Sequence, residues 1–408
     1  MVSHLRKSLV GALSLITVVG VSIVAQVQGS GAQVQASDAL VRGGAQVHRS
    51  ADGANDRQGG AAFAMTNRST GNEIIVYKRA FDGALTRVGS IPTRGTGIGT
   101  DLDTQGGLRL SRDHRFLYAV NAGSDDITVF SVRGTHLTFL QKTYAGDEPN
   151  SLTIHGRLLY VLDGSVAGNG IRGFRLHDNG TLTPLSGSLR LLSSPIAVPG
   201  QVEFSPDGRF LLVTQKTTNV LLKPANAIDV FRVRDNGFAS ALPQRERSHG
   251  VRPFSLAFRN DHQLVVVESF NAAPAAAAVS SYRLSAHGNL NVISGSVRNR
   301  QTDTCWVVVT DDDRYAYSAN FGSGTISSYQ FSTTGKVQLL DGKAAFLGIT
   351  SQPVDLDLAA GSRYLYLLLR GTGGVAAFKV GSNGNLAPLG VVTGGLPVAD
   401  GASGLAVF

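Results

Sequence analysis

The stretch Phe204-Ser-Pro-Asp-Gly-Arg-Phe-Leu-Leu-Val-Thr-Gln215 contains a tight turn followed by an apolar run of strand length that ends on a polar side chain. Ser-Pro-Asp-Gly is a turn sequence, and the run after it is rich in residues that favour strands. Related runs recur along the chain at Ala61–Asn67 (the most degenerate copy), Arg115–Asn121, Arg157–Asp163, His262–Glu268, Arg314–Asn320 and Arg363–Leu369. The chain is therefore built from a repeated unit.

A second, alternating strand follows each run and ends on an aromatic residue. These aromatic residues are Tyr77, Phe130, Phe174, Phe231, Tyr282, Tyr329 and Phe378. They recur roughly every 50 residues, which is the spacing of a four-stranded propeller blade. With strands named a to d from the centre outward, the apolar runs are strands b and the aromatic-ended strands are strands c. The sequence predicts an all-β, seven-bladed β-propeller of four-stranded antiparallel blades.

The ends of the chain predict how the ring closes. The first copy lacks an innermost strand, whereas the chain ends in Gly401-Ala-Ser-Gly-Leu-Ala-Val-Phe408, which has the pattern of a strand a. Placing this segment innermost in the N-terminal blade removes an exposed sheet edge. Cys305 is the single cysteine, so no internal disulfide is available. We expect Cys305 to be a buried apolar residue at a strand start.

The N-terminus has the pattern of an export signal. A basic start is followed by the apolar segment Leu9–Ala25, as in a secretory signal peptide. We expect a signal peptide over residues 1–32, with the cleavage site open, a flexible tether over 33–60 and the propeller over 61–408. The protein is then secreted or held at the cell surface, with no stable membrane span after cleavage. A retained membrane anchor is the alternative.

The composition argues against several classes of partner. The net charge is +8, but lysines and arginines are scattered without a basic run, which disfavours nucleic-acid binding. Metal-ligand spacings of the His-Glu-x-x-His or Cys-x-x-Cys type are absent from the sequence, as is a Gly-x-Ser-x-Gly elbow. The repeat places Asp311–Asp313 at an a-to-b turn, where a solvated turn is expected rather than a cation loop. We expect no metal, no cofactor and a monomer.

The repeat also selects one face of the propeller for a site, because strand b ends and strand a beginnings lie on the same face. Most of the histidines fall in a-to-b or c-to-d turns on the opposite face, and His249 alone is expected on the candidate face. The other candidates there share polar or aromatic character; they are Asn150, Asp163, Gln201, Lys216, Arg252, Glu268, Trp306 and Asn320. The alternative is that short polar side chains at these ends only satisfy the backbone of turns.

Several motifs resemble the lactonase family of seven-bladed propellers, which includes bacterial 6-phosphogluconolactonases and carboxymuconate-lactonizing enzymes. The resemblance covers about residues 61 to 408 and rests on Phe204–Phe210, Asn320–Ser327, Arg363–Tyr366 and the Gly-x-Leu-x-Pro-Leu turns. It implies formation or hydrolysis of a lactone on a sugar acid or similar carboxylate without metal. The chain departs from the family at Pro199-Gly-Gln201, where Pro-Arg-His is common, and at Gln215-Lys-Thr217, where Asn-Glu-Leu is common.

If the chain is a lactonase, Glu268 is expected to act as the general base and Arg252 to hold a substrate carboxylate or the developing oxyanion. His249 is expected to protonate the leaving alkoxide. Asn150, Asp163, Gln201, Lys216, Trp306 and Asn320 are expected to bind the substrate, a small lactone or anionic carbohydrate. The alternative is a non-catalytic extracellular propeller that binds a glycan, a peptide or a surface partner through the same face.

Overall fold

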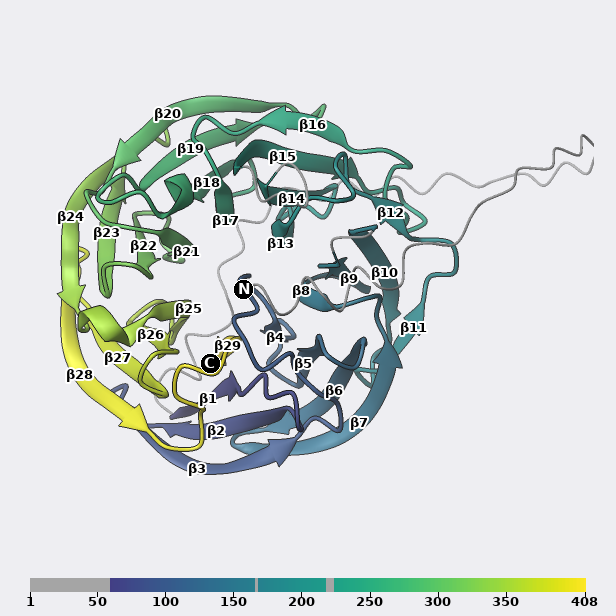
Figure 1. Ribbon diagram of the computed structural model, residues 1–408, viewed down its shortest axis with the longest axis horizontal. Helices are drawn as coiled ribbons and strands as arrows, with labels where there is room; N and C mark the ends of the chain where they lie inside the picture. The colour runs from purple at the N-terminus through teal and green to yellow at the C-terminus, as the bar shows by residue number, and fades with distance from the viewer. Residues whose placement is uncertain (1–58, 166–167, 218–223) are drawn as a thin grey trace, which may run out of the picture. The chain divides into compact units, whose positions relative to one another are not determined.

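Seven antiparallel sheets surround a central channel in the computed structural model (Figure 1), which describes residues 59–165, 168–217 and 224–408. They are numbered here as blades 1 to 7, beginning with the blade that contains β1. The predicted seven-bladed all-β architecture is confirmed. The predicted signal peptide and the tether up to residue 58 lie outside the described residues. Within the described part of the chain, no helix is long and apolar enough to cross a membrane.

Each blade consists of four strands, a to d, from the channel outward. Strands a of blades 1 to 7 are β29 (Leu405–Val407), β4 (Leu108–Leu110), β8 (Pro149–His155), β13 (Pro199–Phe204), β17 (Pro253–Asn260), β21 (Thr304–Val309) and β25 (Pro353–Ala359). Strands b are β1 (Gly60–Met65), β5 (Phe116–Asn121), β9 (Leu158–Asp163), β14 (Phe210–Thr217), β18 (Gln263–Glu268), β22 (Tyr315–Asn320) and β26 (Tyr364–Leu369).

The two outer strands complete each blade. Strands c are β2 (Glu73–Arg79), β6 (Asp126–Arg133), β10 (Gly170–Leu176), β15 (Pro224–Arg232), β19 (Ala278–Leu284), β23 (Thr325–Phe331) and β27 (Gly374–Val380). Strands d are β3 (Leu85–Pro92), β7 (His136–Tyr144), β11 (Leu182–Pro184), β16 (Gln244–Arg247), β20 (Leu290–Arg298), β24 (Val337–Phe346) and β28 (Leu386–Thr393). Blade 3 has an extra strand, β12 (Arg190–Leu191), and short 3-10 turns occur at η3 (Phe270–Ala272) and η4 (Ile349–Ser351).

Strands b carry continuous apolar runs because both of their faces pack against neighbouring blades. Every residue of β22 and of β26 is buried. The outermost strands are largely exposed, as in β28, where exposed residues predominate. The core of the propeller therefore lies between the blades, around strands b.

The turn Ser205-Pro-Asp-Gly208 is stabilised by a hydrogen-bond motif that recurs in other blades. Ser205 Oγ donates to Asp207 Oδ1 over 2.6 Å and accepts from Phe210 N over 3.0 Å. Gly208 completes the turn with a φ of 70°, a conformation that favours glycine. The same hydroxyl–carboxylate pair recurs as Ser111 with Asp113 and as Thr310 with Asp312. The Asp311–Asp313 triplet is thus part of an a-to-b turn, as the repeat predicts.

Tyrosines in several strands b form hydrogen bonds to the neighbouring blade. Each hydroxyl donates to a glycine carbonyl in the c-to-d turn of the next blade. The pairs are Tyr118 with Gly180, Tyr160 with Gly237, Tyr317 with Gly384 and Tyr366 with Gly83, at 2.7 to 3.0 Å. The last pair joins blade 7 to blade 1 and so contributes to closure of the ring.

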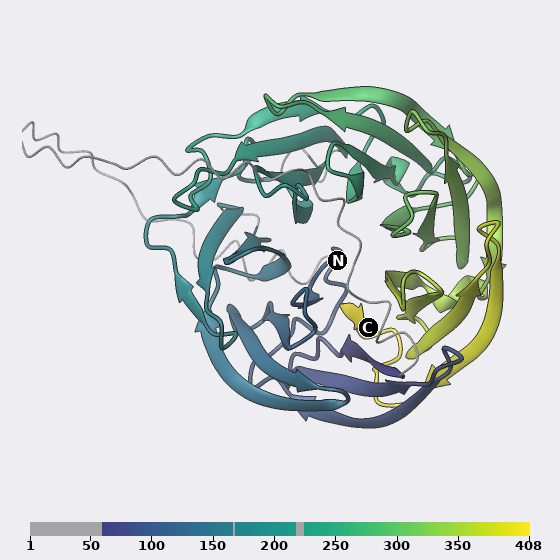
Figure 2. The same ribbon diagram turned by 180° about the vertical axis from the view of Figure 1, so that it is seen from behind.

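The predicted closure by the C-terminal strand is confirmed. β29 pairs antiparallel with β1, with Ala62 opposite Val407 and Ala64 opposite Leu405. Figures 1 and 2 show the two strands side by side from opposite faces of the ring. One sheet therefore combines the two ends of the described chain, which leaves β1 without an open inner edge.

The ring has two faces. The upper face carries the d-to-a and b-to-c connections, and the lower face carries the a-to-b and c-to-d turns. Six histidines lie in or beside lower-face turns, as predicted; they are His114, His136, His155, His177, His262 and His287.

Candidate active site

The connection between β3 and β4 crosses the central channel. Gln105 donates through Nε2 to Val307 O and accepts from Val307 N through Oε1, both over 3.0 Å. Beside it, Thr104 O accepts from the indole Nε1 of Trp306 over 2.7 Å. These bonds connect the start of blade 2 to blade 6. The segment Thr104–Gln105 therefore divides the channel into an upper mouth and a lower cavity.

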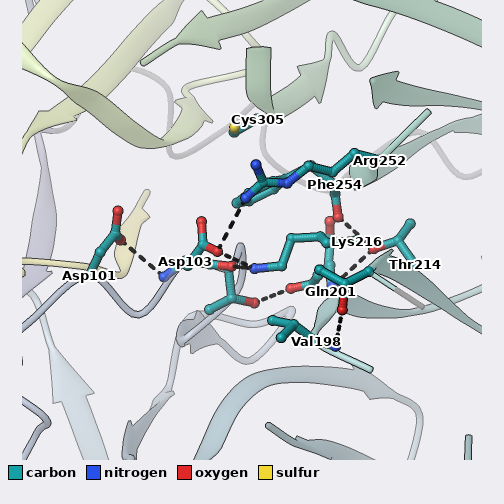
Figure 3. Close-up of polar contacts among 12 residues, drawn as sticks. Asp101, Asp103, Val198, Gln201, Thr214, Lys216, Arg252, Phe254 and Cys305 are labelled. Atoms are coloured by element: carbon teal, nitrogen blue, oxygen red, sulfur yellow. Dashed lines mark hydrogen bonds and ion pairs between the residues drawn. The ribbon is translucent and has the colours of Figure 1, made fainter. Parts of the chain in front are cut away.

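A carboxylate of the same connection lies between two cations at the upper mouth (Figure 3). Lys216 Nζ donates to Asp103 Oδ2 over 2.6 Å and also to the Asp103 carbonyl, and Arg252 Nη2 lies 3.9 Å from the same Oδ2. The Lys216 side chain is 1% exposed and its ammonium lies 4.6 Å from the centre of the Phe254 ring. Asp103 is 38% exposed. A buried ammonium is thus neutralised by a carboxylate that faces solvent.

Arg252 and Asp303 occupy equivalent places, directly before β17 and β21. Both have left-handed backbones, with φ of 57° and 58°. Arg252 Nη1 donates to Asn271 Oδ1 over 3.3 Å, whereas its Nε is buried and has no hydrogen-bond partner among the described residues. The Arg252 side chain as a whole is 19% exposed, so part of the guanidinium is accessible at the mouth.

The carboxyl of Asp303 is perturbed by its surroundings. Burial raises the pKa of Asp303, and this shift is opposed by the nearby Arg252 and by the Cys305 thiol, whose Sγ donates to Asp303 Oδ1 over 3.4 Å. Burial and the two carboxylates of Asp303 and Asp103 raise the pKa of Cys305 well above its usual range. Cys305 is therefore a protonated, buried thiol, as expected for a structural cysteine.

A second ion pair completes the mouth. Arg370 Nη1 lies 3.0 Å from Asp101 Oδ2 and Arg370 also donates through Nε and Nη2 to Gln352 Oε1. Asp101 Oδ1 accepts from Asp103 N over 3.0 Å, which fixes the two aspartates relative to each other. Burial and the neighbouring Asp103 raise the pKa of Asp101, against the effect of Arg370. We call Asp101, Asp103, Lys216, Arg252, Asp303 and Arg370 the mouth cluster.

Blade 3 contributes an acidic group to the same face. Burial, followed by the charges of Asp147, Asp163 and Asp125, raises the pKa of Glu148 to about 7. Burial also raises the pKa of Asp163 to about 6, although it accepts hydrogen bonds from the backbone of Asp147 and Ser165. Asn150 is buried beside this group, with its Oδ1 unpartnered among the described residues. Two predicted substrate-binding residues, Asn150 and Asp163, therefore lie in blade 3.

Glu268, the predicted general base, lies inside blade 5 with 0% of its side chain exposed. Its Oε1 accepts from Gly250 N over 2.8 Å and from Ser280 Oγ over 2.5 Å, and its Oε2 accepts from Ser296 Oγ over 2.7 Å. The exposed His249 contacts the same Ser296 hydroxyl through Nδ1 over 2.9 Å. The structure thus connects Glu268 and His249 through Ser296, and their chemical roles stay predictions.

The other predicted site residues connect strands. Asn320 donates to Thr325 and Ser327 of its own blade over 2.9 Å. Gln201 accepts from Leu256 N over 2.9 Å and so links blades 4 and 5. Trp306 is buried and contacts the crossing segment through its indole. Of the predicted residues, Lys216 and Arg252 are brought together in the mouth cluster.

Asp101, Asp103, Asp303 and Arg370 were not predicted from the sequence. The structure shows that Asp303 occupies a repeated position, because the residues directly before four strands a have left-handed φ values of 46° to 58°; they are Glu148, Arg252, Asp303 and Gln352. The sequence alignment placed Trp306 in that register, whereas Thr304 pairs with the end of strand b. Asp101 and Asp103 lie in a long connection outside the repeat, where no pattern indicates them.

Among the residues that the structure describes, no group of three or more His, Cys, Asp or Glu side chains is arranged to hold a metal ion. The mouth cluster mixes carboxylates with the cations that neutralise them. Such a site suits binding and proton transfer by side chains.

The protein is a seven-bladed β-propeller that is closed by its own C-terminal strand and has a cluster of charged residues at the upper mouth of its channel. The chain belongs to the family of seven-bladed propeller lactonases, whose model, "Lactonase, 7-bladed beta-propeller", matches residues 61–198 and 268–348, more than half of the chain. No curated protein sequence matches it significantly.

Solved structures of similar proteins share the fold. A candidate 6-phosphogluconolactonase from Bacteroides uniformis is 16% identical with a TM-score of 0.66, over 86% of this chain and 100% of that chain. One from Bacteroides fragilis is 18% identical with a TM-score of 0.64, over 86% and 98% of the two chains. The periplasmic gluconolactonase PpgL of Pseudomonas aeruginosa is 16% identical with a TM-score of 0.59, over 85% and 99%. At these identities the likeness shows the fold alone.

Proposed function

We propose that the protein is an exported lactonase that hydrolyses a lactone of a sugar acid at the upper mouth of its channel, without metal. Its family and the names of its structural neighbours support this reaction class. The observation that carries the proposal is the position of Arg252 beside Asp303. A partly exposed arginine next to a carboxyl of raised pKa supplies the two functions that ester hydrolysis needs.

Asp303 is the general base in this proposal. The raised pKa of Asp303 brings its basicity closer to neutral pH, where proton transfer from water is more effective. The water oxygen forms a bond to the lactone carbonyl carbon while its proton passes to Asp303. The partly exposed Arg252 guanidinium donates to the carbonyl oxygen as that oxygen becomes negative. The ring C–O bond then breaks and Asp303 returns the proton to the ring oxygen, which yields the open hydroxy acid.

This assignment differs from the one made for Glu268 because of accessibility. Glu268 has no exposed surface, and both of its oxygens accept hydrogen bonds within blade 5. Asp303 is only half-buried, whereas Glu268 is fully enclosed. The two carboxylates therefore make separate, testable candidates for the base.

The test is hydrolysis of glucono-1,5-lactone, corrected for spontaneous hydrolysis, by the wild type, Asp303→Asn and Glu268→Gln. Asp303→Asn is expected to lower kcat/KM by about 100-fold or more, the usual contribution of a general base. Glu268→Gln is expected to retain turnover per folded molecule. Asp261→Asn is the matched control, because Asp261 is exposed in the a-to-b turn of blade 5.

The outcomes separate the candidates. Full activity of Asp303→Asn together with an inactive but folded Glu268→Gln would transfer the base role to Glu268. If the wild type hydrolyses neither sugar nor aliphatic lactones, the protein is a binding propeller instead. The burial of Trp306 and Phe254 disfavours glycan stacking at the mouth, and the Arg370 guanidinium lies over the partly exposed Phe321 ring, 5.0 Å from its centre.

A further inference from the structure

The mouth cluster is balanced in charge. It contains the cations Lys216, Arg252 and Arg370 and the carboxylates Asp101, Asp103 and Asp303, three of each. An enzyme that binds a phosphorylated or carboxylated substrate needs cations in excess at its site. The described part of this mouth holds no such excess.

Lys216 is not available to an anionic ligand. Its side chain is 1% exposed, and its ammonium donates to both the carboxylate and the carbonyl of Asp103. Figure 3 shows the Asp103 carboxylate lying between Lys216 and Arg252. A substrate phosphate would have to displace this carboxylate or lie beside it as a like charge, and both are unfavourable.

Asp103 is held in this position by its own backbone. It has a left-handed φ of 53°, and its N–H donates to Asp101 Oδ1 over 3.0 Å. Asp101 is in turn fixed by Arg370 over 3.0 Å. The negative charge at the mouth is therefore part of an ordered network that spans blades 4, 5 and 7.

The neighbouring blade adds negative charge. Asp125 of blade 2 and Asp147, Glu148 and Asp163 of blade 3 lie together on the upper face, close enough for the three aspartates to raise the pKa of Glu148 to about 7 after burial. Asp147 is exposed to solvent. A dianionic substrate that approaches the mouth from the side of blade 3 meets the exposed carboxylate of Asp147 first.

The Arg252 guanidinium is partly accessible to an uncharged ligand. Its side chain is 19% exposed, and its Nη2 lies 3.9 Å from Asp103 Oδ2, beyond hydrogen-bond distance, so this nitrogen can donate to a carbonyl oxygen. We propose that the site accepts uncharged lactones and that Asp103 is the specificity-determining residue that excludes phosphorylated or carboxylated ones. This inference rests on the proposed function and adds its substrate class.

The test compares glucono-1,5-lactone with its 6-phosphate ester, a pair that differs only in the phosphate. The wild type is expected to favour the uncharged lactone by about tenfold or more in kcat/KM, given the size of charge interactions at such distances. Asp103→Asn keeps the shape of the side chain and removes its charge. It is expected to shift the ratio of kcat/KM values by about tenfold toward the phosphorylated lactone.

Glu73→Gln is the matched control, because it removes one carboxylate from the same face. Glu73 lies at the start of β2, 3.3 Å from Arg68 and away from the mouth cluster. It is expected to change the ratio by less than about twofold, since screening limits distant surface charges. Circular dichroism and melting temperature confirm that each variant is folded.

Binding of glucono-1,5-lactam and its 6-phosphate, measured by calorimetry, repeats the comparison without turnover. If the wild type prefers the phosphorylated ligand, or if Asp103→Asn leaves the preference unchanged, the inference is overturned while lactone hydrolysis itself can still stand. If no lactone is hydrolysed, the proposed function fails. The lactam preference and its response to Asp103→Asn then decide whether the mouth selects by charge.

Discussion

The two halves of the channel use the same residue types for different purposes. Below the Gln105 partition lies a cavity of about 370 Å³, where Arg109 Nη2 contacts Glu203 Oε2 over 2.5 Å. Asp355 and Asp357 face the same arginine and accept Gly404 N and Val407 N, both over 2.8 Å. Asp357 therefore binds the backbone of β29, the strand that closes the ring, and Asp355 binds the backbone of the glycine directly before it.

At the upper mouth the carboxylates have mostly side-chain partners. Asp103 accepts from Lys216, and Asp303 accepts from the Cys305 thiol. Side chains rearrange more easily than strand backbone, and Asp103 and Asp303 are partly open to solvent. The comparison indicates two roles for an arginine among carboxylates. Arg109 is structural, because the carboxylates around it bind the backbone of the closing segment, whereas Arg252 is available to a ligand, because the carboxylates around it do not.

Removing residues 401–408 should have the largest effect. The deletion removes the buried residues Leu405, Ala406 and Val407, opens the inner edge of β1 and leaves Asp355 and Asp357 without their N–H partners. We expect the melting temperature, measured by differential scanning calorimetry at pH 7, to fall by at least ~10 °C. A melting temperature within ~2 °C of the wild type would contradict the structural role of the lower half.

Replacing the arginine of each half should separate stability from activity. Arg109→Met leaves Glu203, Asp355 and Asp357 without their counter-ion, so we expect a loss of about 4 kcal/mol in the free energy of unfolding. Arg252→Met leaves the half-exposed Asp103 paired with Lys216. We therefore expect the free energy of unfolding to fall by less than about 1 kcal/mol.

Urea unfolding at pH 7 and lactone turnover measure the two effects in the same samples. Arg252→Met is expected to lower kcat/KM by about 100-fold, the scale of a lost oxyanion donor, whereas folded Arg109→Met stays close to the wild type. If Arg109→Met loses activity and Arg252→Met loses stability, the assignment of the two halves is reversed.

The repeat made the fold predictable, whereas the mouth cluster depends on segments outside it. Strand order, closure by Gly401–Phe408 and the turn position of Asp311–Asp313 follow from patterns that recur in every blade. Arg252 and Lys216 were selected because they border repeated strands. Asp101 and Asp103 lie in a connection whose path across the channel is set by tertiary contacts to Trp306 and Val307, and no local pattern encodes such contacts.

The strand position of Glu268 could be predicted from the repeat, but its burial could not. Its place at a strand b end was predicted, and it does lie at the end of β18. The sequence did not reveal that Ser280 and Ser296 from two further strands of the same blade enclose it. Whether a polar side chain faces a channel or the inside of a blade depends on such neighbours, which the repeat alone does not specify.

The smallest expected effect is the pH dependence of stability, which distinguishes Asp355 from Asp357 in the lower half of the channel. Burial raises the pKa of Asp355 from 3.8 to about 7, against the effects of Arg109 and of the N–H donor Gly404. The folded state therefore binds this proton more tightly than the unfolded state. The resulting stability is fully present below about pH 4 and is lost as the pH rises through about 7.

Asp355→Asn removes this titration and keeps an acceptor for Gly404 N. Between pH 5 and pH 8.5, we expect the free energy of unfolding of this variant, relative to the wild type, to rise by about 3 kcal/mol, an order-of-magnitude value. Asp357→Asn is the internal control, because burial raises the pKa of Asp357 to about 6 and the expected change is about 1 kcal/mol. Urea unfolding at both pH values measures these differences. If both variants follow the wild type in parallel, the two carboxyls titrate as solvated groups and the contrast between the lower cavity and the upper mouth does not hold.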